Sequence, residues 1–187
     1  MKNYQITNWC HHFIAEHVVT GDLCIDATAG NGYDTELLCR LVGNSGHVLA
    51  FDIQAAAITS TRNRLQAAHL DERVTLITDS HANMEQYAKK ESISCIVFNL
   101  GYLPSGDHSI ATHAGSTIKA LQASLELLRK GGLISLCIYS GGDSGFEERD
   151  TVLSYIKALD SKKYLVILSQ YYNRPNHPPI PVLIHKL

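Results

Sequence analysis

The chain has 187 residues, of which 45% are hydrophobic and 18% are charged. This composition argues against a disordered protein, no apolar run is long enough to span a bilayer, and the first residues lack the apolar stretch of a secretory signal. Its 16 Lys and Arg against 18 Asp and Glu give a net charge of −2, which argues against binding nucleic acid through bulk positive charge. We therefore expect one folded, cytoplasmic domain over residues 1–187, with no membrane partner.

Short apolar runs alternate with segments of helical period along the chain, which is typical of an α/β fold. Helices are expected over residues 8–19, 33–42, 54–68, 81–89, 116–129 and 146–159. Strands are expected over residues 23–26, 47–52, 74–77, 93–98 and 133–139, with Lys130-Gly131-Gly132 stopping the helix before the last of them. Two more strand-like runs, 164–171 and 181–186, are joined too briefly for a crossover helix and must pair antiparallel.

This order of elements resembles the Rossmann-like fold of class I S-adenosylmethionine-dependent methyltransferases. Their sheet has seven strands that are mostly parallel, and its last strand is antiparallel. A plain dinucleotide-binding domain does not normally end in such a pair, so we expect the methyltransferase arrangement.

The five cysteines form no C-x-x-C pair and three lie in apolar runs, so they are expected to be reduced and mostly buried. They are Cys10, Cys24, Cys39, Cys95 and Cys137. The first helix carries His11, His12 and His17, which could suggest a metal site. No clear carboxylate or cysteine set completes one, so we favour an amphipathic helix that covers the sheet and expect no metal.

The segment from Asp26 to Asp34 leads from a strand through a glycine turn into a helix. Gly30 and Gly32 would let a ligand approach the backbone, although tight turns also need glycine for steric reasons alone. A nicotinamide or flavin site needs a third glycine where Thr35 stands, and a carboxylate beside it would repel a pyrophosphate. S-adenosylmethionine carries an ammonium and a sulfonium, so Asp26 and Asp34 favour that cofactor.

Polar residues end the next three strands as well. Asp52 is placed to bind both ribose hydroxyls of a nucleotide cofactor. Asp79 stands where methyltransferases commonly contact the adenine amino group, with Ser80 or His81 beside the ring; Asp79 or Ser80 could equally be a helix N-cap. The segment from Asn99 to Pro104 resembles the Asn/Asp-Pro-Pro-Tyr loop of amino-group methyltransferases, but Leu100 and Gly101 replace both prolines.

Together, Asp26-x-x-x-Gly-Asn-Gly, Phe51-Asp52-Ile53-Gln54, Asp79-Ser80-His81 and Asn99-Leu100-Gly101-Tyr102-Leu103-Pro104 resemble a small bacterial family long labelled rRNA methylase, which includes the tRNA 5-aminomethyl-2-thiouridine methyltransferase. The resemblance spans nearly the whole chain, including Tyr139-x-Gly-Gly and the late Asn-x-Pro-x-x-Pro-Pro segment. It implies methyl transfer from S-adenosylmethionine to the aminomethyl nitrogen of a wobble uridine in the tRNA anticodon loop. The cofactor-binding residues that it implies are Asp26, Thr28, Gly30, Asn31, Gly32, Asp34, Asp52, Gln54, Asp79, Ser80, His81 and Asn99.

Methyl transfer to an amine mainly requires that a neutral nucleophile is aligned with the methyl group. Burial next to the sulfonium lowers the pKa of the amine, after which a carbonyl oxygen can hold it in line. The expected acceptors are the Asn99 side chain and the Leu100 backbone carbonyl, and His113 is a candidate proton acceptor. Alternatively, Asn99 only satisfies the turn after its strand, and His113 is incidental.

Three tyrosines beyond strand ends, Tyr102, Tyr139 and Tyr172, could stack on an unpaired base, or could simply pack at the rim. Arg174 and Asn176 lie in the proline-rich connection, and Arg174, His177, Lys162 and Lys163 could form one basic cluster for phosphates or a solvated face. An rRNA or small-molecule acceptor, a noncatalytic binding module and a nicotinamide oxidoreductase are the alternatives. A homodimer would enlarge the RNA surface of so short a chain.

Overall fold

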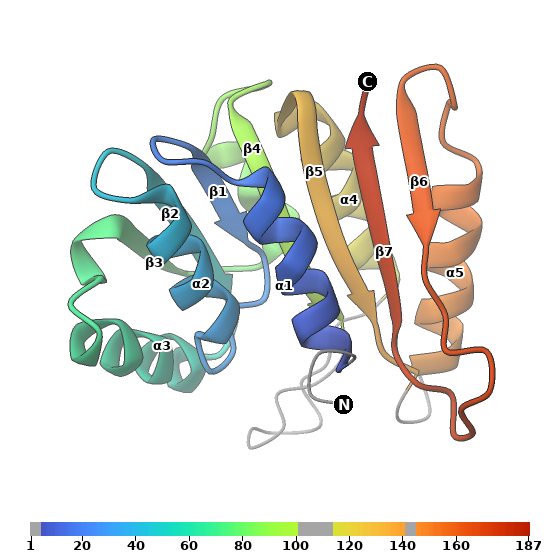
Figure 1. The fold of residues 1–187 in the computed structure, drawn as a ribbon, viewed down its shortest axis with the longest axis horizontal. Helices are drawn as coiled ribbons and strands as arrows, with labels where there is room; N and C mark the ends of the chain where they lie inside the picture. Colours follow the sequence, from blue (N-terminus) through green and yellow to red (C-terminus); the bar gives the residue numbers. More distant parts are fainter. Residues whose placement is uncertain (1–4, 101–113, 141–144) are drawn as a thin grey trace.

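The computed structural model describes residues 5–100, 114–140 and 145–187, and seven strands in these ranges form one sheet. The strands are β1 Leu23–Asp26, β2 His47–Asp52, β3 Val74–Thr78, β4 Ile93–Leu100, β5 Leu128–Ile138, β6 Tyr164–Leu168 and β7 Ile180–Lys186. Their order is β3-β2-β1-β4-β5-β7-β6 (Figure 1). The first five are parallel, and β7 is antiparallel to both β5 and β6. This confirms the predicted fold class.

Helices cover both faces of the sheet (Figure 1). On one face lie α1 Ile6–His17, α2 Tyr33–Val42 and α3 Ala55–Ala67; on the other lie the short 3₁₀ helix η3 His81–Gln86, α4 Ala114–Leu127 and α5 Gly145–Lys157. A second 3₁₀ helix, η2 Asp71–Arg73, precedes β3. α1 buries Cys10 and Ile14, with Val18 just beyond its end, at the i, i+4, i+8 spacing of one helix face, as expected of an amphipathic helix.

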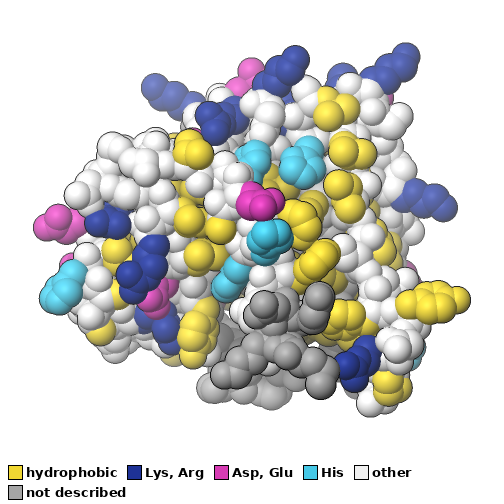
Figure 2. All heavy atoms as spheres, viewed as in Figure 1, with side chains coloured by type: hydrophobic (Ala, Val, Ile, Leu, Met, Phe, Trp, Pro, Cys, Tyr) yellow, Lys and Arg dark blue, Asp and Glu magenta, His cyan; other side chains and the backbone are white. Residues whose placement is uncertain are grey.

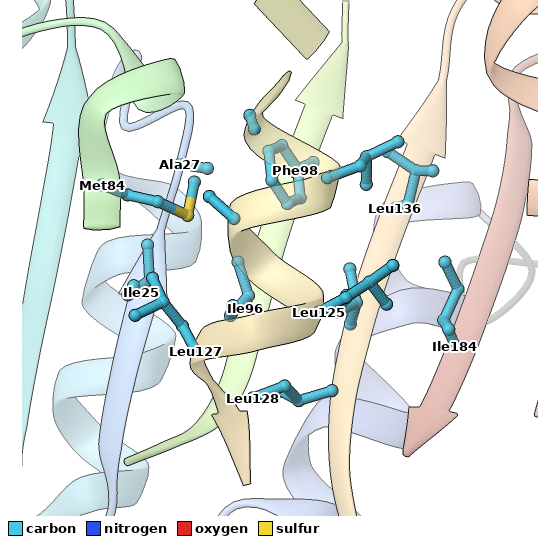
Figure 3. Close-up of a cluster of buried hydrophobic side chains, with 14 of the residues drawn as sticks. Ile25, Ala27, Met84, Ile96, Phe98, Leu125, Leu127, Leu128, Leu136 and Ile184 are labelled. Atoms are coloured by element: carbon cyan, nitrogen blue, oxygen red, sulfur yellow. The ribbon is translucent and has the colours of Figure 1, made fainter. Parts of the chain in front are cut away.

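The two faces of the sheet hold separate apolar clusters. Cys10 and Ile14 of α1 pack with Leu38 and Val42 of α2 on one face. On the other, side chains of η3 and α4 meet those of β1, β4, β5 and β7 (Figure 3). A continuous core on both sides explains why the central strands are apolar along their whole length.

Several predicted boundaries differ from the structure. The helix expected over 81–89 is the six-residue η3, and the strand expected over 164–171 ends at Leu168. The predicted helix stop at Gly131-Gly132 is wrong, because α4 ends at Leu127 and β5 already begins at Leu128, which pairs with Ile93. The register shifts between Ile93 and Cys95, and Gly131 has a φ of +75°, so the glycines lie in an irregular stretch of the strand.

All five cysteines are free and buried, as predicted. Within the described ranges, no helix combines the length and the apolar character needed to cross a membrane. One of the two edge strands of the sheet, β6, exposes the apolar side chains Leu165, Ile167 and Leu168.

Candidate cofactor and acceptor site

The carboxyl ends of β1, β2 and β4 lie side by side in the sheet, and each ends in or next to a polar residue predicted to form the site. Asp26 ends β1, Asp52 ends β2, and Asn99 is the penultimate residue of β4 (Figure 1). Ligands of open α/β sheets bind at this edge, where the strand order reverses. The expected juxtaposition of these residues is therefore found.

The turn after β1 is shaped by glycine and held by Asp52. Gly30 and Gly32 have φ values of +53° and +79°, in the left-handed region that favours glycine. Asp52 Oδ2 accepts a hydrogen bond from the Gly30 amide at 3.0 Å, and Asp52 Oδ1 accepts one from the Gln54 amide at 2.9 Å. Ile53, between Asp52 and Gln54, exposes 54% of its surface and offers an apolar face that an adenine ring could cover.

Three side chains of α3 support the same turn, and the sequence analysis missed them. The Ser60 hydroxyl contacts Asn31 Oδ1 at 3.3 Å, and the Thr61 hydroxyl donates to the Gly30 carbonyl at 3.1 Å. Arg64 Nε donates to the Asn31 carbonyl at 2.7 Å, and its guanidinium lies 3.7 Å from the centre of the Tyr33 ring. Gly32 packs so closely here that a Cβ would lie 3.0 Å from Thr61. The contacts with α3 thus hold the turn in a preformed shape.

Asp26 is fully buried and holds the start of this turn. Its Oδ1 accepts from the Thr28 amide at 3.1 Å and its Oδ2 from the Thr35 hydroxyl at 2.6 Å. Burial, with a smaller contribution from the charge of Asp34, raises the pKa of Asp26 to about 7. The geometry gives Asp26 a supporting position, whereas its direct contact with a cofactor ammonium stays a prediction.

The residues after β3 form a capped helix start. The Ser80 side chain accepts from the Ala82 amide at 3.2 Å, which is the N-cap alternative considered from the sequence. The carboxylate of Asp79 accepts from Asn83 and Tyr87, and these hydrogen bonds lower its pKa. The His81 ring is buried, with Nδ1 3.2 Å from the carbonyl of Ala27 at the start of the turn after β1, and its contact with a cofactor stays a prediction.

Asn99 is held by two other elements. Its amide N–H donates to the Thr28 hydroxyl at 2.8 Å, and its side-chain Nδ2 donates to Asp34 Oδ2 at 2.5 Å. Asp34 Oδ1 lies 2.5 Å from Nε2 of His11, a residue of α1 that the sequence analysis assigned only to helix packing. The carbonyl of Leu100 accepts the Tyr139 amide at 3.3 Å and retains a second lone pair, so its role as an acceptor for the substrate amine stays a prediction. Tyr102 and His113 lie outside the described residues.

The predicted RNA-binding residues Tyr172, Arg174 and Asn176 are exposed in the connection between β6 and β7. Lys162 and Lys163 precede β6, whereas Arg174 follows it, so the prediction of one basic cluster is wrong. α5 supplies residues that were missed at the Arg174 end. The His177 and Phe146 rings are 5.2 Å apart, and the Arg149 guanidinium lies 4.8 Å from the Phe146 ring. Tyr139, directly after β5, is half-buried, and burial raises its pKa.

The sequence profile of one protein family, described as "Putative rRNA methylase", matches residues 48–185. A crystal structure of a protein of that description from Clostridium thermocellum is 48% identical, with 97% of each chain covered and a TM-score of 0.94. A putative methyltransferase from Streptococcus mutans, in complex with SAH (S-adenosylhomocysteine), is 36% identical, with 98% of each chain covered and a TM-score of 0.89.

A curated relative from Arabidopsis thaliana is the chloroplastic tRNA (mnm(5)s(2)U34)-methyltransferase. It is 38% identical over 177 residues, and the match covers 89% of this chain and 65% of the plant protein. This chain therefore spans about two thirds of the length of that relative.

Proposed function

This chain belongs to the family described as putative rRNA methylase, and from that premise we propose that it methylates the aminomethyl nitrogen of 5-aminomethyl-2-thiouridine at the wobble position of tRNA. The observation that carries the acceptor chemistry is the Asn99 amide, held by Asp34 beside the glycine turn. The plant relative is named for mnm(5)s(2)U34, the methylated form of this nucleoside in tRNA, which supports the choice of substrate.

The methyl donor of this family's fold is S-adenosylmethionine, and the residues present fit it. Gly30 and Gly32 carry no side chain, so a ligand can approach the backbone of the turn at these two positions, and Asp52 lies where a carboxylate can accept hydrogen bonds from ribose hydroxyls. Each carboxylate oxygen of Asp52 accepts one hydrogen bond from a backbone amide, and each can accept another from a ligand. Ile53 supplies an exposed apolar surface for the adenine ring.

When bound, this cofactor supplies a methyl group on a cationic sulfur that leaves readily. The chain's own task is to present a neutral amine along the line of that carbon–sulfur bond. Asn99 Oδ1 accepts a hydrogen bond from the amine and directs its lone pair. A lysine-like amine has a pKa near ~10.4, so desolvation at the sheet edge and repulsion from the sulfonium must favour its neutral form.

The RNA contacts are assigned to the edge formed by the β6–β7 connection and α5. Tyr172 is fully exposed and offers a ring for stacking, and Arg174 offers an exposed charge to phosphates of the anticodon loop. Arg149 pairs with Asp150 at 2.7 Å and would exchange this partner for a phosphate. Because these arginines act locally, RNA binding at this edge is compatible with the net charge of −2 of the whole chain.

The exposed apolar residues of the edge strand β6 support the proposal of a homodimer. Analytical ultracentrifugation would test the dimer separately, because it measures the mass of the protein in solution.

The decisive experiment uses the purified chain, labelled S-adenosylmethionine and two tRNA pools, one lacking only the terminal methyl and one lacking the whole aminomethyl group. Digested nucleosides are analysed by mass. We expect methyl incorporation only in the aminomethyl pool, in 5-methylaminomethyl-2-thiouridine. No methyl in either pool, with turnover of rRNA or of a small amine, would replace the proposed substrate. Cofactor binding with no methylated product in any RNA would indicate a noncatalytic module.

A further inference from the structure

Three side chains from separate elements form one hydrogen-bonded chain at the acceptor site. His11 Nε2 of α1 lies 2.5 Å from Asp34 Oδ1 of α2, and Asp34 Oδ2 accepts from Nδ2 of Asn99 on β4 at 2.5 Å. The His11 and Asp34 side chains are 27% and 12% exposed. The carboxylate is thus shielded, with a donor on each oxygen.

The chemistry of a carboxylate decides the orientation of both neighbours. An ionised carboxylate only accepts hydrogen bonds, so it requires an N–H from the imidazole and the NH₂ end of the amide. With Nδ2 turned to Asp34, the Oδ1 atom of Asn99 is the end of the amide that can accept a hydrogen bond from a substrate amine. Without its partner on Oδ1, Asp34 would lose one of the two contacts that fix its position.

Charge gives His11 a second effect. Its pKa is raised, chiefly by the hydrogen bond to Asp34, so its positive form is favoured and offsets the carboxylate. An uncompensated Asp34 would favour the ammonium form of the substrate, which cannot attack the methyl group. Within the described ranges, the other titratable groups near His11 or Asp34 are Cys10, Asp26, Cys95, Cys137 and Tyr139.

We propose that His11 is a positioning residue for the acceptor amine: through Asp34 it orients the Asn99 amide, and its charge keeps the amine in its neutral form. This proposal rests on the proposed function, because it concerns transfer to an amine. Figure 2 shows histidine side chains gathered over α1 on this face of the molecule. One of the histidines of α1, His12, serves as a control for His11. His12 lies 3.5 Å from Glu16 and its side chain is 59% exposed.

The test compares His11→Ala, His11→Gln and the control His12→Gln as full chains, with tRNA that carries the aminomethyl group. The alanine variant removes both donor and charge, and kcat should fall about 10- to 100-fold, the range for one lost charge-assisted hydrogen bond. Glutamine restores a donor, so it should recover most of kcat. Both variants should move the acid limb of the kcat–pH profile to higher pH, whereas His12→Gln should leave it in place.

The same measurements in an Asp34→Asn background complete the test, because His11→Gln should then cause no further shift of the profile. If wild type methylates the tRNA and the His11 variants follow the His12→Gln profile, the positioning role is wrong and the proposed function stands. If wild type methylates no amine, the proposed function itself is overturned. A fall in kcat for His11→Ala without glutamine recovery or a pH shift would indicate only a structural role.

Discussion

The backbone amide of Gly30 donates a hydrogen bond to Asp52 Oδ2 at 3.0 Å, which ties the turn after β1 to the carboxyl end of β2. The same carboxylate therefore shapes the turn and faces the position proposed for the ribose. Loss of its side chain should affect the cofactor more than the fold, because the glycine turn keeps its contacts to Thr61 and Arg64.

Asp52→Ala should weaken S-adenosylmethionine binding by about 10- to 100-fold, because hydrogen bonds to a charged group contribute about 1.5–3 kcal/mol. Isothermal titration calorimetry measures this directly. Asp71→Ala is the matched control, because Asp71 is exposed in η2, before β3. Equal affinities of the two variants would exclude Asp52 from the cofactor site.

Three glycine substitutions separate backbone strain from steric clash. Gly32→Ala combines a φ of +79° with a Cβ 3.0 Å from Thr61, Gly131→Ala has a φ of +75° with no atom within 4 Å, and Gly115→Ala is free of both. We expect Gly131→Ala to cost about 1–2 kcal/mol and Gly32→Ala to cost more, while Gly115→Ala gains about 0.5–1 kcal/mol in α4. Urea unfolding measures all three, and equal losses for Gly32→Ala and Gly131→Ala would contradict the close packing at Thr61.

Asp26 should make the protein less stable as the pH rises. Its folded pKa of about 7 lies above the unfolded value. Between the unfolded pKa near ~3.9 and the folded one, the folded protein binds more protons, so this group's contribution to the free energy of unfolding falls as pH rises. Asp26→Asn can keep both hydrogen bonds, since its oxygen can accept from Thr28 and its NH₂ can donate to the Thr35 hydroxyl.

The urea midpoint of Asp26→Asn should therefore exceed that of wild type by a margin that grows from about pH 5 to pH 8. The exposed Asp71→Asn provides the comparison for a general change in charge. A constant difference between Asp26→Asn and wild type across this range would show that Asp26 stays ionised in the folded protein.

Asn99→Ala should lower kcat about 100-fold or more, the scale for loss of one oriented catalytic hydrogen-bonding group, while cofactor affinity changes little. Single-turnover kinetics and calorimetry separate the two effects. Asn44→Ala, which removes a surface amide that contacts Arg73, should alter neither. A normal kcat for Asn99→Ala would show that the Asn99 side chain only satisfies the turn after β4 and does not hold the substrate amine.

Arg149→Ala and Arg174→Ala should each weaken tRNA binding, with a salt dependence that decreases by about one counterion per lost phosphate contact. Filter binding at several salt concentrations tests this. Lys162→Ala is the control, because Lys162 precedes β6 and Arg174 follows it. A comparable effect of Lys162→Ala would move the RNA surface away from the β6–β7 connection.

The strands and the glycine turn could be predicted because their signals are local. The apolar run before Asp26 and the glycines after it lie within one short segment, and the brief connection between the last two strands dictates their antiparallel pairing. Boundaries that depend on tertiary contacts could not be predicted in this way. Leu128 joins β5 because it pairs with Ile93, and no pattern around Leu128 contains that information.

The supporting contacts of the site were missed for the same reason. His11, Asp34 and Asn99 are 23 and 65 residues apart along the chain, and no spacing within any one element relates them. Arg64 similarly reaches the turn at Asn31 only because α3 packs beside α2. A histidine on a predicted amphipathic helix resembles many others until the sheet places a carboxylate opposite it.

The position of β7 between β5 and β6 has a consequence for the order of folding. Among the described strands, β6 pairs with β7 alone, so its link to the parallel part of the sheet runs through a strand that follows it in the chain. Until β7 inserts, a folding chain carries β6 without a strand partner, and the backbone N–H and C=O groups of β6 are unpaired. Insertion of β7 is therefore the event that both joins β6 to the sheet and pairs its backbone, while Leu165 and Ile167 stay exposed in the finished fold.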